Sequence, residues 1–165
     1  MTGQVEARLS EMGIQLPPPV APIADYVPFV RTGNLVFVSG QVPKGPDGTS
    51  ITGRLTAEDH AADGITAPGS RLGLGVGAAT LCALNVLAQL KACIGDLDRV
   101  VRVVKLTGFV NADASFTQHP QVINGASSLM IGAFGDAGQH ARAAVGSSSL
   151  PGGVICEVEA VFEVA

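Results

Sequence analysis

The sequence predicts an α+β fold in which one β-sheet carries two main helices on one of its faces. Runs of β-branched residues and segments of strict apolar–polar alternation predict strands near both ends and in the middle of the chain. Two longer segments with apolar residues at helical spacing lie between these strands. The resulting order is ββ(β)-α-β-α-ββ. Two helices cover only one face of a sheet, so the other face is either solvated or an oligomer interface.

Composition indicates a globular protein, and the length of 165 residues fits a single domain spanning residues 1–165. Hydrophobic residues make up 47% and charged residues 15% of the chain. So few charges leave much apolar surface uncovered, which favours self-association. The net charge of −4 argues against a nucleic-acid partner, because phosphate binding favours a basic face.

The cysteines and the N-terminus indicate where the protein resides. Three cysteines, without any C-x-x-C motif, predict free thiols rather than a structural zinc site, and free thiols suit a reducing cytoplasm. The N-terminal segment mixes acidic and basic residues and lacks the apolar centre of a signal peptide. No apolar run approaches the roughly 20 residues that cross a bilayer. We therefore expect a cytoplasmic protein without a membrane partner.

The N-terminal region predicts a short helix followed by an extended arm. Apolar residues recur at helical spacing over residues 3–12, and Gly13 is a suitable stop. The three prolines at 17–19 fix φ and remove backbone donors, so this stretch is extended. We expect residues 1–24 to form a helix and a proline arm lying on the body of the domain.

A β-hairpin is predicted next, with strands from Tyr26 to Arg31 and from Leu35 to Ser39 joined at Thr32-Gly33-Asn34. Gly40 ends the second strand. A glycine at this position permits close approach of the backbone by a ligand or by another chain.

The middle of the chain predicts the helical layer and a central strand. Residues 51–55 suit a third short strand, and residues 57–62 a helical turn. The main helix is expected over 74–94 and a second helix over 120–134, both from apolar residues at helical spacing. Between them, residues 98–110 are dense in β-branched residues, which is typical of a central strand.

The C-terminal region predicts a second hairpin, with strands from Ala141 to Ser148 and from Val154 to Val164 around a Leu-Pro-Gly-Gly turn. The second strand alternates, with Cys156, Val158, Ala160, Phe162 and Val164 on one face and Glu157, Glu159, Glu163 on the other. Such a hairpin would place Arg142 of the first strand and these glutamates on neighbouring strands. A rigid cation bordered by carboxylates could bind a small acid in a shared pocket.

Three other motifs have ordinary structural explanations. Residues 73–78 match G-x-G-x-x-A, but a polar, proline-bearing loop precedes them instead of a strand, so we interpret them as a glycine-rich helix start packed closely on the sheet. Ser147–Ser149 with His140 and Asp136 suggest a hydrolase triad, but no G-x-S-x-G elbow is present. The three histidines lack i, i+4 spacing, so neither a metal nor another cofactor is expected.

Three stretches together resemble the YjgF-like reactive-intermediate deaminase family, also named for its chorismate-mutase-like fold and for an early endoribonuclease claim. Residues 31–43 are similar to the family's R-x-G-N-L-V-F-V-S-G-Q-x-P motif. Residues 103–110 and the C-terminal region, with Ala141-Arg-Ala-Ala-Val, Leu150-Pro151 and Val158-Glu-Ala, follow at the family's spacing. The resemblance spans Tyr26 to Val164. Residues 1–24 and an inserted loop at 56–70 indicate an extended subgroup.

The resemblance implies a mixed β-sheet, a homotrimer with a cleft at each subunit interface, and hydrolysis of enamine or imine acids of the 2-aminoacrylate type to 2-keto acids and ammonia. The partners expected from it are therefore a small carboxylate-bearing metabolite and further copies of the chain. Arg142 matches the arginine that binds the substrate carboxylate, and Glu157 matches the catalytic glutamate. The remaining substrate-binding positions fall on Tyr26, Gly40, Asn124 and Ala144.

The sequence departs from the family pattern at three places and leaves two other functions open. Ala144 stands where many members have cysteine, and His140 precedes Arg142 by two residues where a proline is usual. The G-P-Y-S motif has become Ala-Asp-Tyr-Val at residues 24–27. One alternative is a trimeric protein that binds or senses a keto acid without turnover. The other is RNA cleavage, against which the acidic balance counts.

Overall fold

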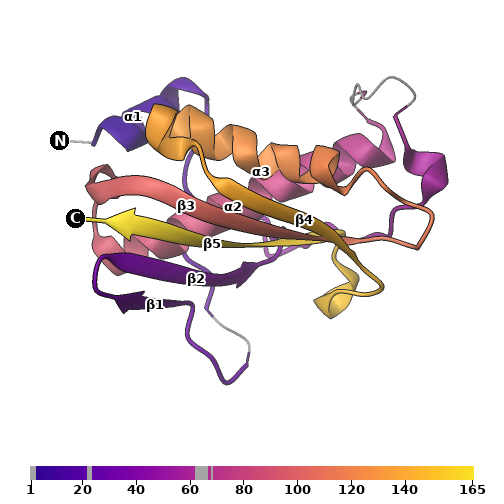
Figure 1. Ribbon diagram of the computed structural model, residues 1–165, viewed down its shortest axis with the longest axis horizontal. Helices are drawn as coiled ribbons and strands as arrows, with labels where there is room; N and C mark the ends of the chain where they lie inside the picture. The colour runs from indigo at the N-terminus through magenta and orange to yellow at the C-terminus, as the bar shows by residue number, and fades with distance from the viewer. Residues whose placement is uncertain (1–2, 22–23, 62–66, 68) are drawn as a thin grey trace.

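The computed structural model describes residues 3–21, 24–61, 67 and 69–165, and within them the chain forms a mixed five-stranded sheet with helices (Figure 1). The strand order is β1-β2-β5-β3-β4; all neighbours are antiparallel except β3 and β4, which are parallel. The α+β class and the mixed sheet are confirmed. The strands are β1 Phe29–Thr32, β2 Leu35–Gln41, β3 Val100–Asn111, β4 Ala141–Ser147 and β5 Cys156–Val164. The α-helices are α1 Gln4–Glu11, α2 Arg71–Ile94 and α3 His119–Phe134.

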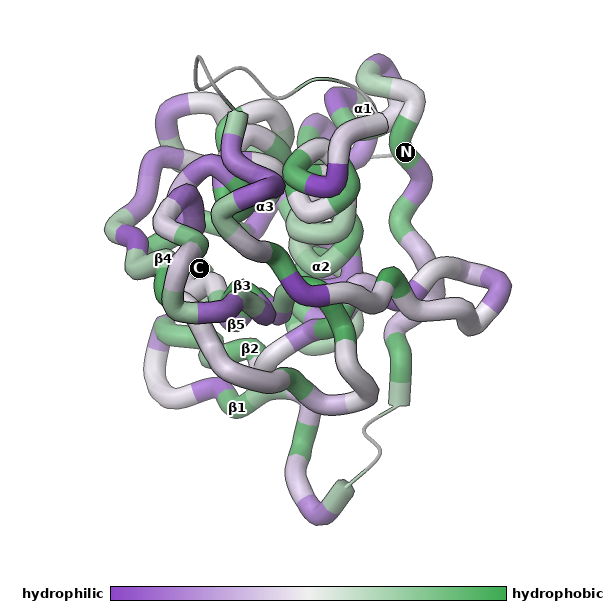
Figure 2. Tube along the Cα trace, turned by 90° about the vertical axis from the view of Figure 1, so that its right-hand side faces the viewer, coloured by the Kyte–Doolittle hydropathy of each residue, from purple (hydrophilic) through white to green (hydrophobic). Residues whose placement is uncertain are grey.

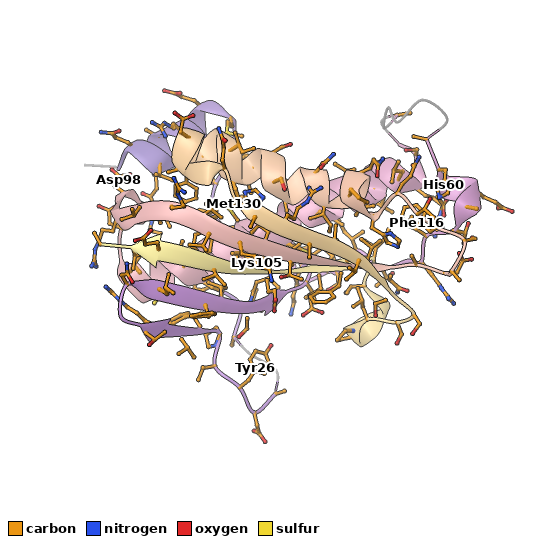
Figure 3. All side chains as sticks on the ribbon, viewed as in Figure 1. Tyr26, His60, Asp98, Lys105, Phe116 and Met130 are labelled. Atoms are coloured by element: carbon orange, nitrogen blue, oxygen red, sulfur yellow. The ribbon has the colours of Figure 1, made fainter. Side chains whose placement is uncertain are left out.

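The N-terminal helix and arm lie on the body of the domain, as the sequence predicts. Asp98 accepts hydrogen bonds from the backbone N–H groups of Gln4 and Val5, at 2.7 and 2.8 Å, and so anchors the start of α1 (Figure 3). Further along, the buried side chain of Gln89 on α2 donates to the carbonyl of Val20. These bonds hold the arm against the helix layer.

The predicted C-terminal hairpin is wrong, because β4 and β5 are not neighbours. β3 lies between them and pairs with both, in parallel with β4 and antiparallel with β5 (Figure 1). The reason is the crossover helix: β3, α3 and β4 form a βαβ unit. The helix brings the chain back to the end of the sheet at which β3 begins, so β4 runs parallel to β3. The alternation along β5 correctly predicts its buried and open faces but does not identify its partners.

The main helix α2 begins at Arg71, three residues before the expected start, because Ser70 caps it by accepting a hydrogen bond from the N–H of Gly73 at 2.9 Å. The glycine-rich stretch therefore lies inside the helix. It packs on α3: a Cβ on Gly75 would meet Val122 of α3 at 3.4 Å, and a Cβ on Gly125 of α3 would collide with the carbonyl of Val76. The expected close contact with the sheet is replaced by a close contact between helices.

Together α2 and α3 cover one face of the sheet, α2 over β2 and β5 and α3 over β3 and β4. By length and composition α2 could cross a membrane, contrary to the expectation that no stretch could, but 61% of its apolar window is buried inside the fold. Figure 2 shows the white and green tube of α2 running through the helix layer beside the sheet. Its apolar surface is thus largely used by the core.

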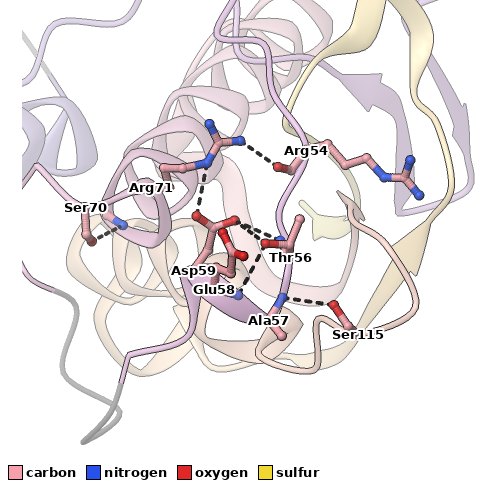
Figure 4. Close-up of polar contacts among 9 residues, drawn as sticks. Arg54, Thr56, Ala57, Glu58, Asp59, Ser70, Arg71 and Ser115 are labelled. Carbon is pink, nitrogen blue, oxygen red and sulfur yellow. Dashed lines mark hydrogen bonds and ion pairs between the residues drawn. The ribbon is translucent and has the colours of Figure 1, made fainter.

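The segment before α2 is tied to its surroundings by polar contacts (Figure 4). The predicted third strand at 51–55 is wrong: only isolated bridges form, from Thr52 to Val154 and from Leu55 to Ala112. The predicted helical turn is a 3-10 helix, Ala57–Asp59, and residue 62 lies outside the described residues. Asp59 pairs with Arg71 of α2 at 3.1 Å. Of the inserted loop, residues 62–66 and 68 are likewise outside the described residues.

The sheet face opposite the helices carries both charged and apolar side chains. The polar side chains of this face, Lys105, Thr107 and Glu159, are partly or fully exposed. Apolar side chains accompany them: Val30 is 53%, Phe37 45% and Val145 46% exposed. In register, Val30 faces Phe37, and Phe37 faces Val161 of β5. A continuous apolar strip therefore crosses β1, β2 and β5.

Candidate functional site

The predicted site residues fall into two separate groups, and the first surrounds Arg142 on β4. Arg142 pairs in register with the buried Leu106 of β3, so its side chain points to the helix side of the sheet. There its Nη1 donates to Asn124 Oδ1 at 2.8 Å and to Ser127 Oγ at 3.1 Å, both on α3. The sequence predicted Asn124 but missed Ser127. Their i, i+3 spacing, which places both on one helix face, is the signal that could have found it.

A chain of hydrogen bonds extends from Arg142 through Ser127 to His140. His140 Nδ1 lies 2.6 Å from the carbonyl oxygen of Gly138, which can only accept, so Nδ1 carries a proton. In the neutral ring Nε2 is then the acceptor, and it lies 2.9 Å from Ser127 Oγ. The hydroxyl of Ser127 therefore donates to His140 and accepts from Arg142. This directed chain fixes the serine hydroxyl and, through it, one edge of the guanidinium.

The rest of the Arg142 guanidinium is available to a ligand. Among the described residues Arg142 forms no ion pair, and its Nε and Nη2 groups donate no hydrogen bond. The side chain is partly buried rather than extended into solvent. Ala144, two residues further along β4, is partly buried and packs against the hydrophobic core. An arginine held at one nitrogen, with its other donors unused, suits a planar anion such as a carboxylate.

The second group surrounds Glu157, at the start of β5. Tyr26, Gly40 and Glu157 line a cavity of about 690 Å³ at the end of β2, together with Lys44 and Asn85. Figure 3 shows Tyr26 beyond β1, at the edge of the sheet far from β4 and α3. Three of the predicted positions are thus brought together, although none of them touches Arg142 in the same chain.

Gly40 is needed because the Glu157 carboxylate occupies the space that a side chain would take. A Cβ at residue 40 would overlap Oε1 of Glu157. The close approach that the sequence predicted at Gly40 is therefore made by a side chain of the same chain. The glycine lets the carboxylate lie flat over β2 at the cavity wall.

The Glu157 carboxyl has the properties of a proton carrier. Burial raises its pKa above the ordinary glutamate value, and the nearby Glu159 carboxylate raises it further. No cation pairs with it among the described residues. A carboxyl with a raised pKa exchanges its proton closer to neutral pH than an exposed glutamate does, which suits general acid–base chemistry.

Arg142 and Glu157 do not share a pocket within one chain, so that prediction is wrong. Leu106 of β3 pairs with both Arg142 and Ala160, and Glu157 lies three residues before Ala160 on β5. The two residues are therefore roughly 10 Å apart along the strands and roughly 10 Å apart across them. They also lie on opposite faces of the sheet: Arg142 is on the helix side, whereas Glu157 alternates with the buried residues of β5.

Ser147, His140 and His60 are held in local hydrogen bonds. Ser147 Oγ donates to the carbonyl of Ser149 at 2.7 Å, and His140 bonds Ser127, so the residues suggested as a hydrolase triad do not assemble. His60 accepts from the N–H of Thr117 at 3.0 Å. In the described part of the chain no three His, Cys, Asp or Glu side chains are grouped to hold a metal ion.

With this fold and these two groups of residues, the chain was compared with known proteins. Residues 6–164 match the family described as YjgF/chorismate mutase-like, putative endoribonuclease, and the chain belongs to this family. A curated relative, Protein TCP17 of Trypanosoma cruzi, is 45% identical over 163 residues, which cover 98% of this chain and 95% of the relative.

Two solved structures are similar over nearly the whole chain. A protein of unknown function from Agrobacterium tumefaciens is 41% identical with a TM-score of 0.83, and the match covers 98% of this chain and 92% of that one. A putative endoribonuclease from Shewanella oneidensis is 30% identical with a TM-score of 0.86, covering 98% and 100%. The N-terminal helix and arm are thus included in both matches.

Proposed function

We propose that the protein is a homotrimeric deaminase that hydrolyses enamine and imine acids of the 2-aminoacrylate type to 2-keto acids and ammonia. The observation that carries the proposal is Arg142: a guanidinium held on β4 by Asn124 and Ser127, with unused donors and no ion pair among the described residues. Membership of the YjgF family supports it. The three free cysteines support a cytoplasmic location.

The separation of Arg142 and Glu157 favours an assembly of several copies. Because the two side chains lie on opposite faces of one sheet, a site that uses both takes one of them from a neighbouring copy. The strip of Val30, Phe37 and Val161 on the open face gives such copies an apolar surface to bury. We propose that Arg142 of one subunit faces the cavity of Tyr26, Gly40 and Glu157 of the next.

In the proposed reaction Arg142 binds the substrate carboxylate through two parallel N–H···O bonds. A proton from solvent adds to the enamine CH₂ carbon and gives the iminium ion, whose C2 is intrinsically electrophilic. Water then adds to C2, and Glu157 takes one proton from this water and passes it to the nitrogen. Cleavage of the C–N bond releases ammonia, and the remaining hydroxyl proton returns to solvent and leaves the 2-keto acid. Holding the carboxylate and the water in place supplies much of the rate, because the electrophile needs little activation.

The test is hydrolysis of 2-aminoacrylate by the purified protein, measured as the rate of pyruvate formation above the uncatalysed rate. Arg142→Ala is expected to lower kcat/KM by about 10- to 100-fold, because it removes the charge-assisted hydrogen bonds that bind the substrate carboxylate. Arg142→Lys is the matched control, which keeps the positive charge but cannot form the bidentate contact with the carboxylate. Wild-type protein that forms no pyruvate above background, with several such acids, would refute the proposal.

The second candidate is a protein that binds a keto acid without turning it over. Ala144 favours this function, because this residue has a methyl group where many members of the family carry a thiol. This function predicts that 2-ketobutyrate raises the melting temperature, that Arg142→Ala abolishes the effect, and that no substrate is turned over.

Endoribonuclease activity is named in the description of the family and of the Shewanella relative, and the net charge of −4 counts against it. Cleavage of RNA that co-purifies with the trimer and disappears in Arg142→Ala would favour it.

A further inference from the structure

His140 connects the anchor of Arg142 to a side chain that can change its charge. The imidazole is held at both nitrogens: Nδ1 donates to the carbonyl of Gly138 at 2.6 Å, and Nε2 accepts from Ser127 Oγ at 2.9 Å. Ser127 Oγ in turn accepts from Arg142 Nη1 at 3.1 Å. Histidine is the side chain that ordinarily gains or loses its charge between about pH 5 and pH 8. A titratable ring is thus joined, through one hydroxyl, to the guanidinium that would bind the substrate.

Protonation of His140 would reverse one hydrogen bond of this chain without breaking it. Nδ1 already carries a proton, because the carbonyl of Gly138 can only accept, so the added proton goes to Nε2. Nε2 then donates to Ser127 Oγ, whose two lone pairs accept one bond from His140 and one from Arg142. The hydroxyl proton of Ser127 is released from His140 by this change. It can then be donated to an oxygen of an anion bound at Arg142.

The same proton adds a positive charge close to Arg142. Hydrogen bonds of 2.9 and 3.1 Å place His140 Nε2 no more than about 6 Å from Arg142 Nη1. Both side chains are partly buried, so solvent screens their charges less than it screens charges at the open surface. Without a ligand the two cations repel each other, whereas a bound carboxylate attracts both. Binding of an anion at Arg142 and binding of a proton at His140 therefore favour each other.

The other charged side chains near His140 are exposed in the part of the chain that the structure describes. Asp136, on the 3-10 helix Gly135–Gly138, forms neither a hydrogen bond nor an ion pair with His140. On β3, Arg102 and Lys105 are both exposed, and Lys105 lies on the open face of the sheet. α3 carries no charged residue after the histidine with which it begins. Arg142 is therefore the charged group to which hydrogen bonds connect His140.

We propose that His140 is a positioning residue for the anion site, and that its protonation strengthens the binding of carboxylate substrates and products to Arg142. The inference rests on the proposed function, because it assigns a regulation to the same guanidinium. A proton taken from solvent at Nε2 supplies a second positive charge and turns the Ser127 hydroxyl toward the ligand. The protein then holds 2-keto acids and imine acids more tightly in mildly acidic than in alkaline solution.

The test measures the dissociation constant of 2-ketobutyrate by calorimetry between about pH 5.5 and pH 8, in buffers of different ionisation enthalpy. For the wild-type protein we expect the affinity to rise about 3- to 10-fold toward the acidic end, with net uptake of protons on binding. His140→Gln keeps a hydrogen-bonding group that cannot be protonated, so it should lose most of this pH dependence and of the proton uptake. His60→Gln is the matched control, because His60 contacts Thr117 and Phe116 instead, and it should keep both.

If His140→Gln does not fold, NMR titration of the wild-type protein decides. The chain has three histidines, so the ring C–H signals of His140 can be assigned once those of His60 and His119 are identified by substitution. Saturating 2-ketobutyrate should move the titration of His140 to higher pH.

An equal pH dependence in the wild type and in His140→Gln overturns the inference, as does a His140 titration that the ligand leaves unchanged. Pyruvate formation from 2-aminoacrylate in the same wild-type preparation then shows that the proposed function stands. Proton-linked binding that depends on His140, without any turnover, supports the inference and refutes the deaminase. Absence of both binding and turnover overturns both.

Discussion

Replacing Gly40 with alanine introduces one methyl group at the point where the Glu157 carboxylate crosses β2. Gly40 is not among the glycines with positive φ, so an alanine is compatible with its backbone. The new Cβ would nevertheless overlap Glu157 Oε1, and either the carboxylate leaves its rotamer or the strands move apart. Because the atom met is the end of a flexible side chain, the carboxylate turns aside, and the cost is that of a displaced rotamer, about 0.5–1.5 kcal/mol. We expect Gly40→Ala to lower the free energy of unfolding by that amount.

The reasoning predicts a change of sign when the carboxylate is removed. In a Glu157→Ala background the three atoms nearest to the new Cβ are gone, and Gly40→Ala should be neutral or stabilise by about 0.4–1 kcal/mol through the unfolded state. Denaturant unfolding of the wild type, both single variants and the double variant gives the coupling energy between the two sites.

Gly77→Ala is the matched control, since a Cβ at this exposed glycine of α2 meets no atom within 4 Å. It should stabilise by about 0.5–1 kcal/mol whichever residue occupies position 157. If Gly40→Ala had the same effect with and without the Glu157 carboxylate, the contact would not be what requires glycine there.

Three further predictions concern the carboxyl, the guanidinium and the helix contact. Because the folded-state pKa of Glu157 is raised, its contribution to stability is full below the unfolded pKa of about 4.3 and is lost as pH rises through the folded value. Glu157→Gln should therefore stabilise at neutral pH, and the advantage should vanish in denaturation at pH below 4; an equal advantage at both pH values contradicts this. Ser127→Ala should weaken the binding of 2-keto acids to Arg142 about 3- to 10-fold in calorimetry, whereas Ser127→Thr should retain affinity; equal losses would show that the hydroxyl is not used. Gly125→Ala should lower the unfolding free energy by about 1–3 kcal/mol, since its Cβ meets the carbonyl of Val76, and an unchanged midpoint would place the helices further apart.

Local sequence patterns predicted the elements of this fold well. The helix over 120–134 is α3, and the alternation after residue 154 correctly assigns Cys156 to the buried face and Glu159 to the open face of β5. Such patterns are determined by neighbours along the chain, since a period of two or 3.6 residues decides which side chains share a face. Boundaries were less accurate: β1 begins at Phe29 rather than Tyr26.

For the candidate site, the sequence supplied the residues but not their arrangement. The resemblance at residues 31–43, at residues 103–110 and in the C-terminal region predicted the family, and the family is confirmed. The roles of Tyr26, Gly40, Asn124, Ala144, Arg142 and Glu157 stay predictions. Ser127 was missed, because its i, i+3 spacing from Asn124 becomes informative only once that helix face is known to contact Arg142.

The sequence by itself determined the helices, most strands and the buried and open faces of β5. Only the tertiary structure decided that β3 separates β4 from β5, and hence that Arg142 and Glu157 lie on opposite sides of one sheet. The physical reason is that strand pairing joins backbone groups far apart in sequence, and a crossover helix reverses the direction that a short turn would have imposed. Side-chain periodicity carries no information about which strand lies alongside.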